Sequence, residues 1–212
     1  MYARGEGVSQ SHQEAAKWYE KAATQGNVEA QFSLATLYAT GRGVAKDEAK
    51  AAGWLRKAAD KGDPGAQNSL AIAYDTGRGV PLDPEEAVKL WRKAAGQGFT
   101  AAQSRLGVMY EKGRGVAQDP KEAMRLFRAA AAKAYPDAGM NLGRIYAEGV
   151  NVQKDLVQAY RWFWSAARHY PVNDVMSACA AEQKCKALAR EMTREEVGRA
   201  ERQARQNDPR PH

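Results

Sequence analysis

The sequence predicts an all-α protein made of stacked two-helix repeats, and three observations support this fold class. The tetrapeptide GRGV begins at Gly41, Gly77 and Gly113, and these glycines lie 36 residues apart. The same step reaches Gly5 and Gly149, so the period holds across most of the chain. Between these glycines the apolar residues follow the period of a helix, and the alternation that marks a strand is missing. A fixed period in the range of roughly 20–50 residues is typical of repeat architectures.

One repeat, residues 28–62, predicts two helices that each have a single apolar face. Apolar residues fall at i, i+4, i+7 and i+8 in its first half and at i, i+3, i+4, i+7 and i+8 in its second half, which is the helical pattern. The two sets are Ala30, Leu34, Leu37 and Tyr38, and then Ala51, Trp54, Leu55, Ala58 and Ala59. Such a pair cannot bury its apolar faces alone, so it must stack on its neighbours.

Cap and turn residues locate the helices within each repeat. An aspartate, or a serine in the first repeat, is expected to cap each second helix, so these helices should begin near residues 11, 47, 83, 119 and 155. Gly26, Gly62 and Gly98 are expected to close the second helix in a left-handed conformation. Ala134 and Tyr170 take that place later, which predicts less regular closures there.

Large and small side chains recur at fixed places in the repeats. Small residues at positions 35, 71, 107 and 143 are expected to let the helices approach closely. Large aromatic residues are expected to fill the remaining core space: Trp18, Trp54, Trp91, Phe127 and Phe163.

The repeated pattern A…LA.LY..GRGV..D..KA..WLRKAA..G, over residues 1–171, resembles the Sel-one-like repeat (SLR), a relative of the tetratricopeptide repeat. Two departures are Asn151, in place of the second loop glycine, and Gly139, in place of a recurring glutamine. The resemblance implies an α-solenoid, a right-handed superhelix of helix-turn-helix repeats that binds proteins or peptides as a scaffold or adaptor. The closing segment MTREEVGRAERQAR also resembles the helix that follows many bacterial SLR arrays.

The period and its end predict four parts of the chain. Residues 1–27 form a partial first repeat with a second helix only, and residues 28–171 form four full repeats. Residues 172–206 are expected to form two capping helices, the last one opened by a capping box of Thr193 and Glu196. Residues 207–212 are expected to be a disordered tail.

The glycines of GRGV allow two interpretations, a phosphate-binding loop or a turn. A phosphate loop usually follows a strand and precedes a Lys-Ser/Thr pair, and the sequence has neither feature here. We therefore interpret GRGV as the bend between the two helices of a repeat. Arg42, Arg78 and Arg114 would then form a ladder along one edge, and solvated arginines near the loop aspartates are the favoured interpretation.

The sequence shows no constellation of catalytic or metal-binding residues. His12, His169 and His212 lack ligand spacing, and two cysteines are too few for a zinc site. We expect neither an enzyme nor a metal or other cofactor, and no stretch approaches the length of a membrane span. The net charge of +7 leaves nucleic-acid or acidic-ligand binding as the alternative to a protein-binding scaffold.

In the related tetratricopeptide fold, the first helix of each repeat lines the concave binding face. On this sequence the resemblance places there residues that vary between repeats: Phe32, Thr36, Asn68, Ile72, Asp75, Ser104, Arg105, Val108, Glu111, Met140, Asn141 and Arg144. The guanidinium groups of Arg105 and Arg144 and the amide groups of Asn68 and Asn141 suit a peptide backbone or carboxylate. A solvated polar groove without a ligand would have the same composition.

Cys179 and Cys185 are either a short-loop disulfide or two free thiols. Residues six apart in a regular helix are separated by about 9 Å along its axis, so a disulfide requires a break between helices. A bridge would favour a periplasmic or secreted protein, and reduced cysteines would fit a cytoplasmic one.

The register of the period places Met1 and Tyr2 at the end of a first helix whose body is missing. Trp18 and Tyr19 of the following helix would then lack their cover. We expect Met1 to be an internal residue of a longer natural protein, and the alternative is a partner chain that covers this face.

Overall fold

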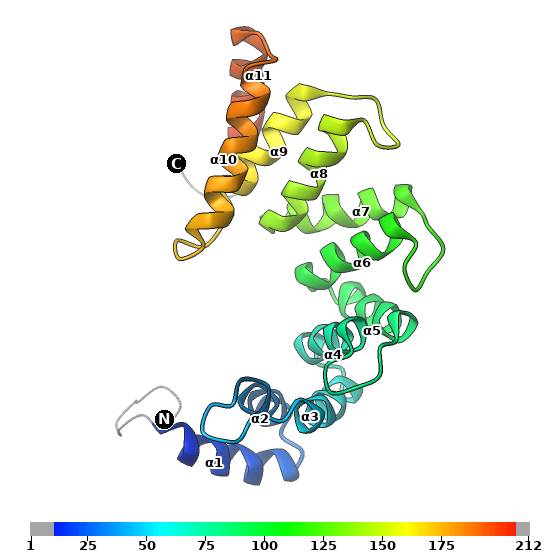
Figure 1. The fold of residues 1–212 in the computed structure, drawn as a ribbon, viewed down its shortest axis with the longest axis vertical. Helices are drawn as coiled ribbons and strands as arrows, with labels where there is room; N and C mark the ends of the chain where they lie inside the picture. Colours follow the sequence, from blue (N-terminus) through cyan, green and yellow to red (C-terminus); the bar gives the residue numbers. More distant parts are fainter. Residues whose placement is uncertain (1–10, 207–212) are drawn as a thin grey trace. The chain divides into compact units, whose positions relative to one another are not determined.

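The computed structural model describes residues 11–206, and every regular element in this range is an α-helix (Figure 1). The helices are α1 (His12–Thr24), α2 (Val28–Thr40), α3 (Glu48–Asp60), α4 (Pro64–Thr76), α5 (Pro84–Gly96), α6 (Thr100–Lys112), α7 (Pro120–Ala131), α8 (Pro136–Glu148), α9 (Leu156–His169), α10 (Val175–Ala189) and α11 (Arg194–Gln206). The predicted all-α fold is confirmed, and the second helices begin within one residue of the expected positions. The expectations for Met1, Tyr2 and the tail at 207–212 lie outside the described residues.

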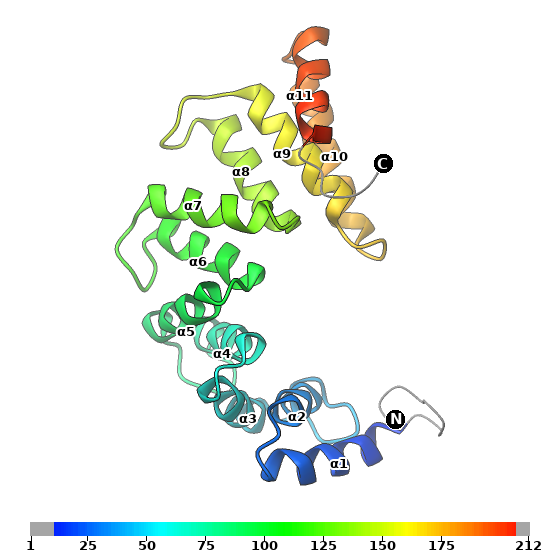
Figure 2. The ribbon, with the colours of Figure 1, turned by 180° about the vertical axis from the view of Figure 1, so that it is seen from behind.

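The chain forms two compact units. The first unit runs to Ala102 and includes residues 113–117, and the second consists of residues 103–112 and everything after residue 117. In the first unit each of the helices α1 to α4 packs against the next one along the chain (Figure 2). In the second unit α7 packs on α8 and α8 on α9, and α9 then contacts both α10 and α11.

The second helices begin where side-chain caps satisfy their first N–H groups. Asp47 accepts a hydrogen bond from the N–H of Lys50 at 2.9 Å, and the equivalent aspartates do the same in α5, α7 and α9. Thr193 and Glu196 exchange hydrogen bonds at the start of α11, where each backbone N–H donates to the side chain of the other residue. This reciprocal capping box was predicted from the sequence. Each such cap contributes about 1 kcal/mol to helix stability.

The closure of the second helices follows the sequence in part. Gly26, Gly62 and Gly98 have positive φ angles, as expected. Ala134 keeps the same left-handed conformation, with φ of 59°, although it carries a Cβ. Tyr170 instead adopts an extended conformation, so the last second helix ends differently from the others.

The second glycine of each GRGV loop lies directly on the helix start of the repeat before it. A Cβ atom on Gly79 would lie 2.0 Å from the carbonyl oxygen of Glu48, and one on Gly43 would lie 2.2 Å from the carbonyl carbon of His12. Gly115 meets the carbonyl oxygen of Pro84 in the same way, at 2.3 Å. The loop is therefore a packing contact between successive repeats, which only glycine allows.

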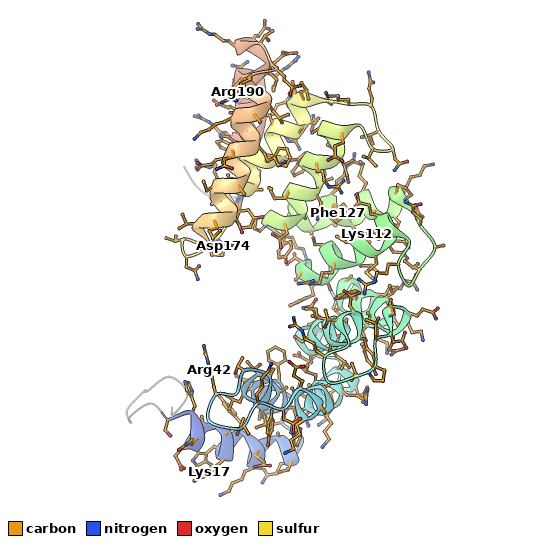
Figure 3. All side chains as sticks on the ribbon, in the orientation of Figure 1. Lys17, Arg42, Lys112, Phe127, Asp174 and Arg190 are labelled. Atoms are coloured by element: carbon orange, nitrogen blue, oxygen red, sulfur yellow. The ribbon has the colours of Figure 1, made fainter. Side chains whose placement is uncertain are left out.

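Small residues and aromatic rings pack together inside the second unit. A Cβ on Gly107 would lie 2.7 Å from the ring of Phe127, which is labelled in Figure 3 and fully buried. A Cβ on Gly143 would lie 2.6 Å from the ring of Phe163. The absence of a side chain at these two helix positions makes room for the next aromatic ring, as predicted.

The expectation that all five large aromatic residues belong to the core is wrong for one of them. Trp91, Phe127 and Phe163 are buried, but Trp18 is 55% exposed. Trp54 is half-buried and packs against a hydrophobic core cluster of the first unit, and the amine of Lys57 lies 4.0 Å from its ring centre. The reason is register, since Trp18 and Trp54 stand one residue before the repeat position of the other three. One residue rotates a side chain by about 100° around a helix.

We expect Gly79→Ala and Gly53→Ala to have opposite effects on stability. At Gly79, with φ of +68°, the added Cβ would collide with α3, and the left-handed backbone alone costs about 1–2 kcal/mol. Gly53 lies in the middle of α3 with open space around its Cβ position, so alanine there should raise the free energy of unfolding by about 0.5–1 kcal/mol. Urea unfolding followed by circular dichroism measures both. Equal effects of the two substitutions would contradict the packing role of the loop glycine.

Candidate functional site

A groove of about 290 Å³ lies in the first unit among α2, α3 and α4. Three residues of the predicted binding face line it: Phe32 and Thr36 from α2 and Ile72 from α4. The other lining residues are Ala35, Ala39, Lys46, Glu48, Ala51, Ala52, Leu55, Ser69, Ala73 and Arg78. Five alanines and a leucine make most of this lining apolar, so the groove can accept an apolar group.

Charged side chains also line this groove. The amine of Lys46 lies 2.8 Å from the carboxylate of Glu48. This hydrogen-bonded ion pair, with a smaller contribution from Arg78, lowers the pKa of the Glu48 carboxyl below its usual value. Lys46, Arg78 and Glu48 therefore lie next to the apolar lining of the groove, and the two cations can attract an additional anion.

The second unit has a smaller groove of about 100 Å³ among α6, α7, α8 and the loop that follows α8. Of the predicted binding residues, Glu111 lines it. Its other lining residues are Pro120, Lys121, Ala123, Met124, Ile145, Val150, Asn151 and Val152. Asn151 occupies the place of the second loop glycine and adopts its left-handed conformation, with φ of 57°.

Ion pairs engage three of the predicted charged residues. Arg144 pairs with Glu111, and its guanidinium also lies 3.2 Å from Glu148. Partial burial would lower the pKa of Arg144, but the hydrogen bonds to Glu111 and Glu148 raise it overall. Asp75 lies 3.1 Å from Arg114 of the next loop. A ligand carboxylate at these places would have to displace an existing partner.

The remaining predicted residues differ in their exposure. Arg105 is exposed, Asn141 is half-buried, and Val108 and Met140 each pack partly against a hydrophobic core cluster of the second unit. Ser104 is buried. Of the predicted residues in the second unit, only Ser104 is therefore fully buried.

Asn68 does not lie on an exposed face, which corrects the prediction. It is buried, and its Oδ1 accepts a hydrogen bond from the indole nitrogen of Trp91 at 3.1 Å. A buried indole N–H requires a partner, and Asn68 supplies it. The signal in the sequence was the shift of this tryptophan by one position, since Trp54 stands one repeat position earlier and remains half-buried.

Asn68→Ala should therefore destabilise the first unit rather than weaken a binding surface. The substitution leaves the buried N–H of Trp91 without its acceptor, and this costs about 1–3 kcal/mol. Urea unfolding monitored by tryptophan fluorescence measures the loss. An unchanged free energy of unfolding would contradict the structural role of this hydrogen bond.

The two cysteines are free thiols, so the disulfide alternative is wrong. Both lie within the single helix α10, with Cys179 exposed and Cys185 buried. Their separation of six residues along a continuous helix exceeds the reach of a disulfide. Burial raises the pKa of the Cys185 thiol to about 12. The expectation of an oxidising compartment stays a prediction and gains no support from these residues.

Thiol labelling should distinguish the two cysteines. In the folded protein Cys179 should react with a maleimide, while Cys185 should react slowly because its thiol is buried and stays protonated at neutral pH. Unfolding without a reductant should then expose two reactive thiols. Mass spectrometry counts the labels, with Cys179→Ser as the control, and fewer than two labels in the unfolded chain would contradict the assignment of two free thiols.

The arginines of the GRGV loops do not form a uniform ladder. Arg42, labelled in Figure 3, is exposed, whereas Arg114 pairs with Asp75 and Arg78 lines the groove near Glu48. Within residues 11–206, no cluster of three or more His, Cys, Asp or Glu side chains could hold a metal ion. In the same range no helix combines the length and the apolar character that crossing a membrane requires.

Known proteins resemble this chain in sequence and in fold. The family model described as Sel1 repeat matches residues 1–27, 28–63, 64–99, 100–135 and 136–170. A Sel1 repeat protein from Oxalobacter formigenes is 35% identical, with a TM-score of 0.78, over 97% of this chain and 84% of that one. No match was found among curated protein sequences.

Two further solved structures show how widely the fold is used. A protective antigen present in uropathogenic Escherichia coli, described as displaying an SLR fold, is 26% identical with a TM-score of 0.75; the similarity covers 95% of this chain but 52% of that one. An immunity protein from Pseudomonas aeruginosa shares the fold at 21% identity, with a TM-score of 0.52 over 92% of this chain and 75% of that one. The matched repeats and the Oxalobacter relative together show that the chain belongs to the Sel1 repeat family.

Proposed function

We propose that this chain is a non-catalytic scaffold that binds another protein or a peptide through the exposed side of its first helices. Sel1 repeat proteins are generally protein-interaction scaffolds and are typically not catalytic. In the first unit this side belongs to α2 and α4, and in the second unit to α6 and α8. The groove of the first unit is the main candidate for the contact.

The groove of the first unit is the observation that carries the proposal. Phe32 and Ile72 bring large apolar side chains to an open groove, and both remain only half-buried in the free chain. Apolar surface that a free protein leaves accessible beside charged groups is typical of a binding site. A partner that covers these side chains would gain the free energy of removing them from water.

Variation between repeats also supports a specific partner. The position of Thr36 carries Ile72, Val108 and Arg144 in the later repeats, and none of these four residues is buried, although the caps and loops around them repeat closely. Repeats that share their caps and loops but differ in their exposed side chains give each array a binding surface of its own.

The charges favour a protein partner over nucleic acid. Several cations already have acidic partners, such as Arg125, which forms two hydrogen bonds with Glu122, and Lys89, which pairs with Glu86. Binding to nucleic acid depends on cations that neutralise phosphates, and it weakens steeply as salt is raised.

A peptide-display selection on the full chain tests this function. Dodecapeptides selected on the wild-type chain should bind Phe32→Ala/Ile72→Ala at least tenfold more weakly, because the variant loses the apolar side chains of the groove. Lys89→Ala, which changes an exposed residue of α5 outside the groove, should bind as the wild type does. Fluorescence anisotropy of the labelled peptides measures the affinities.

Two results would contradict the proposed function. One is the failure to select any peptide that binds the folded chain. The other is tight binding of a random-sequence DNA duplex at physiological salt, with an affinity that falls steeply with salt concentration.

A further inference from the structure

The repeats differ at two core positions that face the grooves. At one position the repeats carry Ala16, Ala52, Val88 and Met124, and at the other they carry Leu37, Ala73, Met109 and Ile145. The two positions of a groove come from neighbouring repeats, and among these pairs only Ala52 with Ala73 has a small residue at both positions. These two alanines line the groove of the first unit, while Met124 and Ile145 line the smaller groove of the second unit.

The volumes of the two grooves differ in the direction that these side chains predict. The groove measures about 290 Å³ where both residues are alanine and about 100 Å³ where they are methionine and isoleucine. Unfilled apolar space loses dispersion contacts that a well-packed core makes. The first unit therefore has room for side-chain atoms that its own chain does not supply at this place.

Charge distinguishes the two grooves as well. Lys46 and Arg78 line the groove of the first unit, and the equivalent residues in the second unit are Gln118 and Val150. The larger groove therefore has two cations and the carboxylate of Glu48, whereas the smaller groove has one cation, Lys121, and one carboxylate, Glu111. Arginine and lysine form charge-assisted hydrogen bonds with carboxylates, and these are stronger than neutral ones.

We propose that the groove of the first unit is a specificity pocket for one large apolar side chain of a partner peptide that carries an aspartate or glutamate close by. The side chain fills the space left by Ala52 and Ala73, and the carboxylate meets Lys46 and Arg78. The proposal rests on the scaffold function and names the chemistry of its partner. An apolar cavity of about 150 Å³ holds a benzene molecule, so the groove has room for an aliphatic or aromatic side chain.

The double variant Ala52→Met/Ala73→Ile tests the pocket by filling it with the residues that the second unit uses. It should melt at a higher temperature than the wild type, because the new side chains occupy open apolar space. It should also bind the labelled dodecapeptides selected on the wild-type chain at least tenfold more weakly. A structural defect would lower both the melting temperature and the peptide affinity. A higher melting temperature together with weaker binding therefore indicates a blocked pocket rather than misfolding. A lower melting temperature would overturn the proposal.

The charge requirement has its own matched pair of variants. Arg78→Val replaces the arginine with the residue that the last repeat carries at this position, and Arg42→Val makes the same change one repeat earlier, outside the groove. Loss of a charge-assisted hydrogen bond should weaken binding on the order of tenfold for Arg78→Val and leave Arg42→Val unchanged. Replacing the peptide's own Asp or Glu by the amide should weaken binding to the wild type on the order of tenfold or more, and should weaken binding to Arg78→Val less, because only Lys46 then remains to meet the carboxylate.

The outcomes separate this proposal from the scaffold function. Peptides that bind the filled variant and the wild type equally, or that share no acidic residue, would overturn the pocket and leave the scaffold intact. If the chain selected no peptides at all, both would fail. We expect the selected peptides to share an apolar residue beside an acidic one. Their binding should be lost on Ala52→Met/Ala73→Ile and weakened on Arg78→Val.

Discussion

The contact between the second loop glycine and the preceding helix start sets the spacing of the repeats. Gly79 brings its loop so close to Glu48 that no side chain fits between the two backbones. The loop of each repeat thereby rests on the N-terminal turn of the second helix of the repeat before it. Since this turn is itself fixed by an aspartate or serine cap, two local features, a cap and a glycine, define how one repeat stacks on the next.

This frame constrains some positions strongly and leaves others free. The small residue opposite each aromatic ring belongs to the constrained set, because Gly107 and Gly143 have no space for a Cβ beside Phe127 and Phe163. The outer side of the first helices is less constrained, and there the side chains change from repeat to repeat. Binding specificity can therefore vary without disturbing the stacking of the helices.

Much of the fold could be predicted from the sequence because it depends on local chemistry. The caps at Asp47 and its equivalents, and the box of Thr193 and Glu196, follow from residue types at fixed spacing. The predictions failed where the outcome depended on a side chain's direction or on a distant partner. Trp91 is buried and Trp54 half-buried because they differ by one position in the repeat, which rotates them to different sides of the helix.

The candidate site could be predicted only in part, for the same reason. Phe32 and Ile72 of the first helices line a groove, and their role in binding stays a prediction. The role of Asn68 depended on the indole of Trp91, a residue 23 positions away. The alanines of the groove gave no signal in the sequence, since alanine is common throughout these helices.

The role of Ala52 and Ala73 can be recognised only when the grooves between neighbouring repeats are compared in the structure. Replacing a buried isoleucine or methionine by alanine usually costs about 2–5 kcal/mol, because the cavity that remains does not collapse. The groove of the first unit is open, so water can occupy it and the cost is smaller than for a closed cavity. The repeats around this groove are also held by their caps and by Gly79, independently of these two positions. A repeat array can therefore give up packing at one site without losing its fold, and the space that results, next to Lys46 and Arg78, is available to a partner.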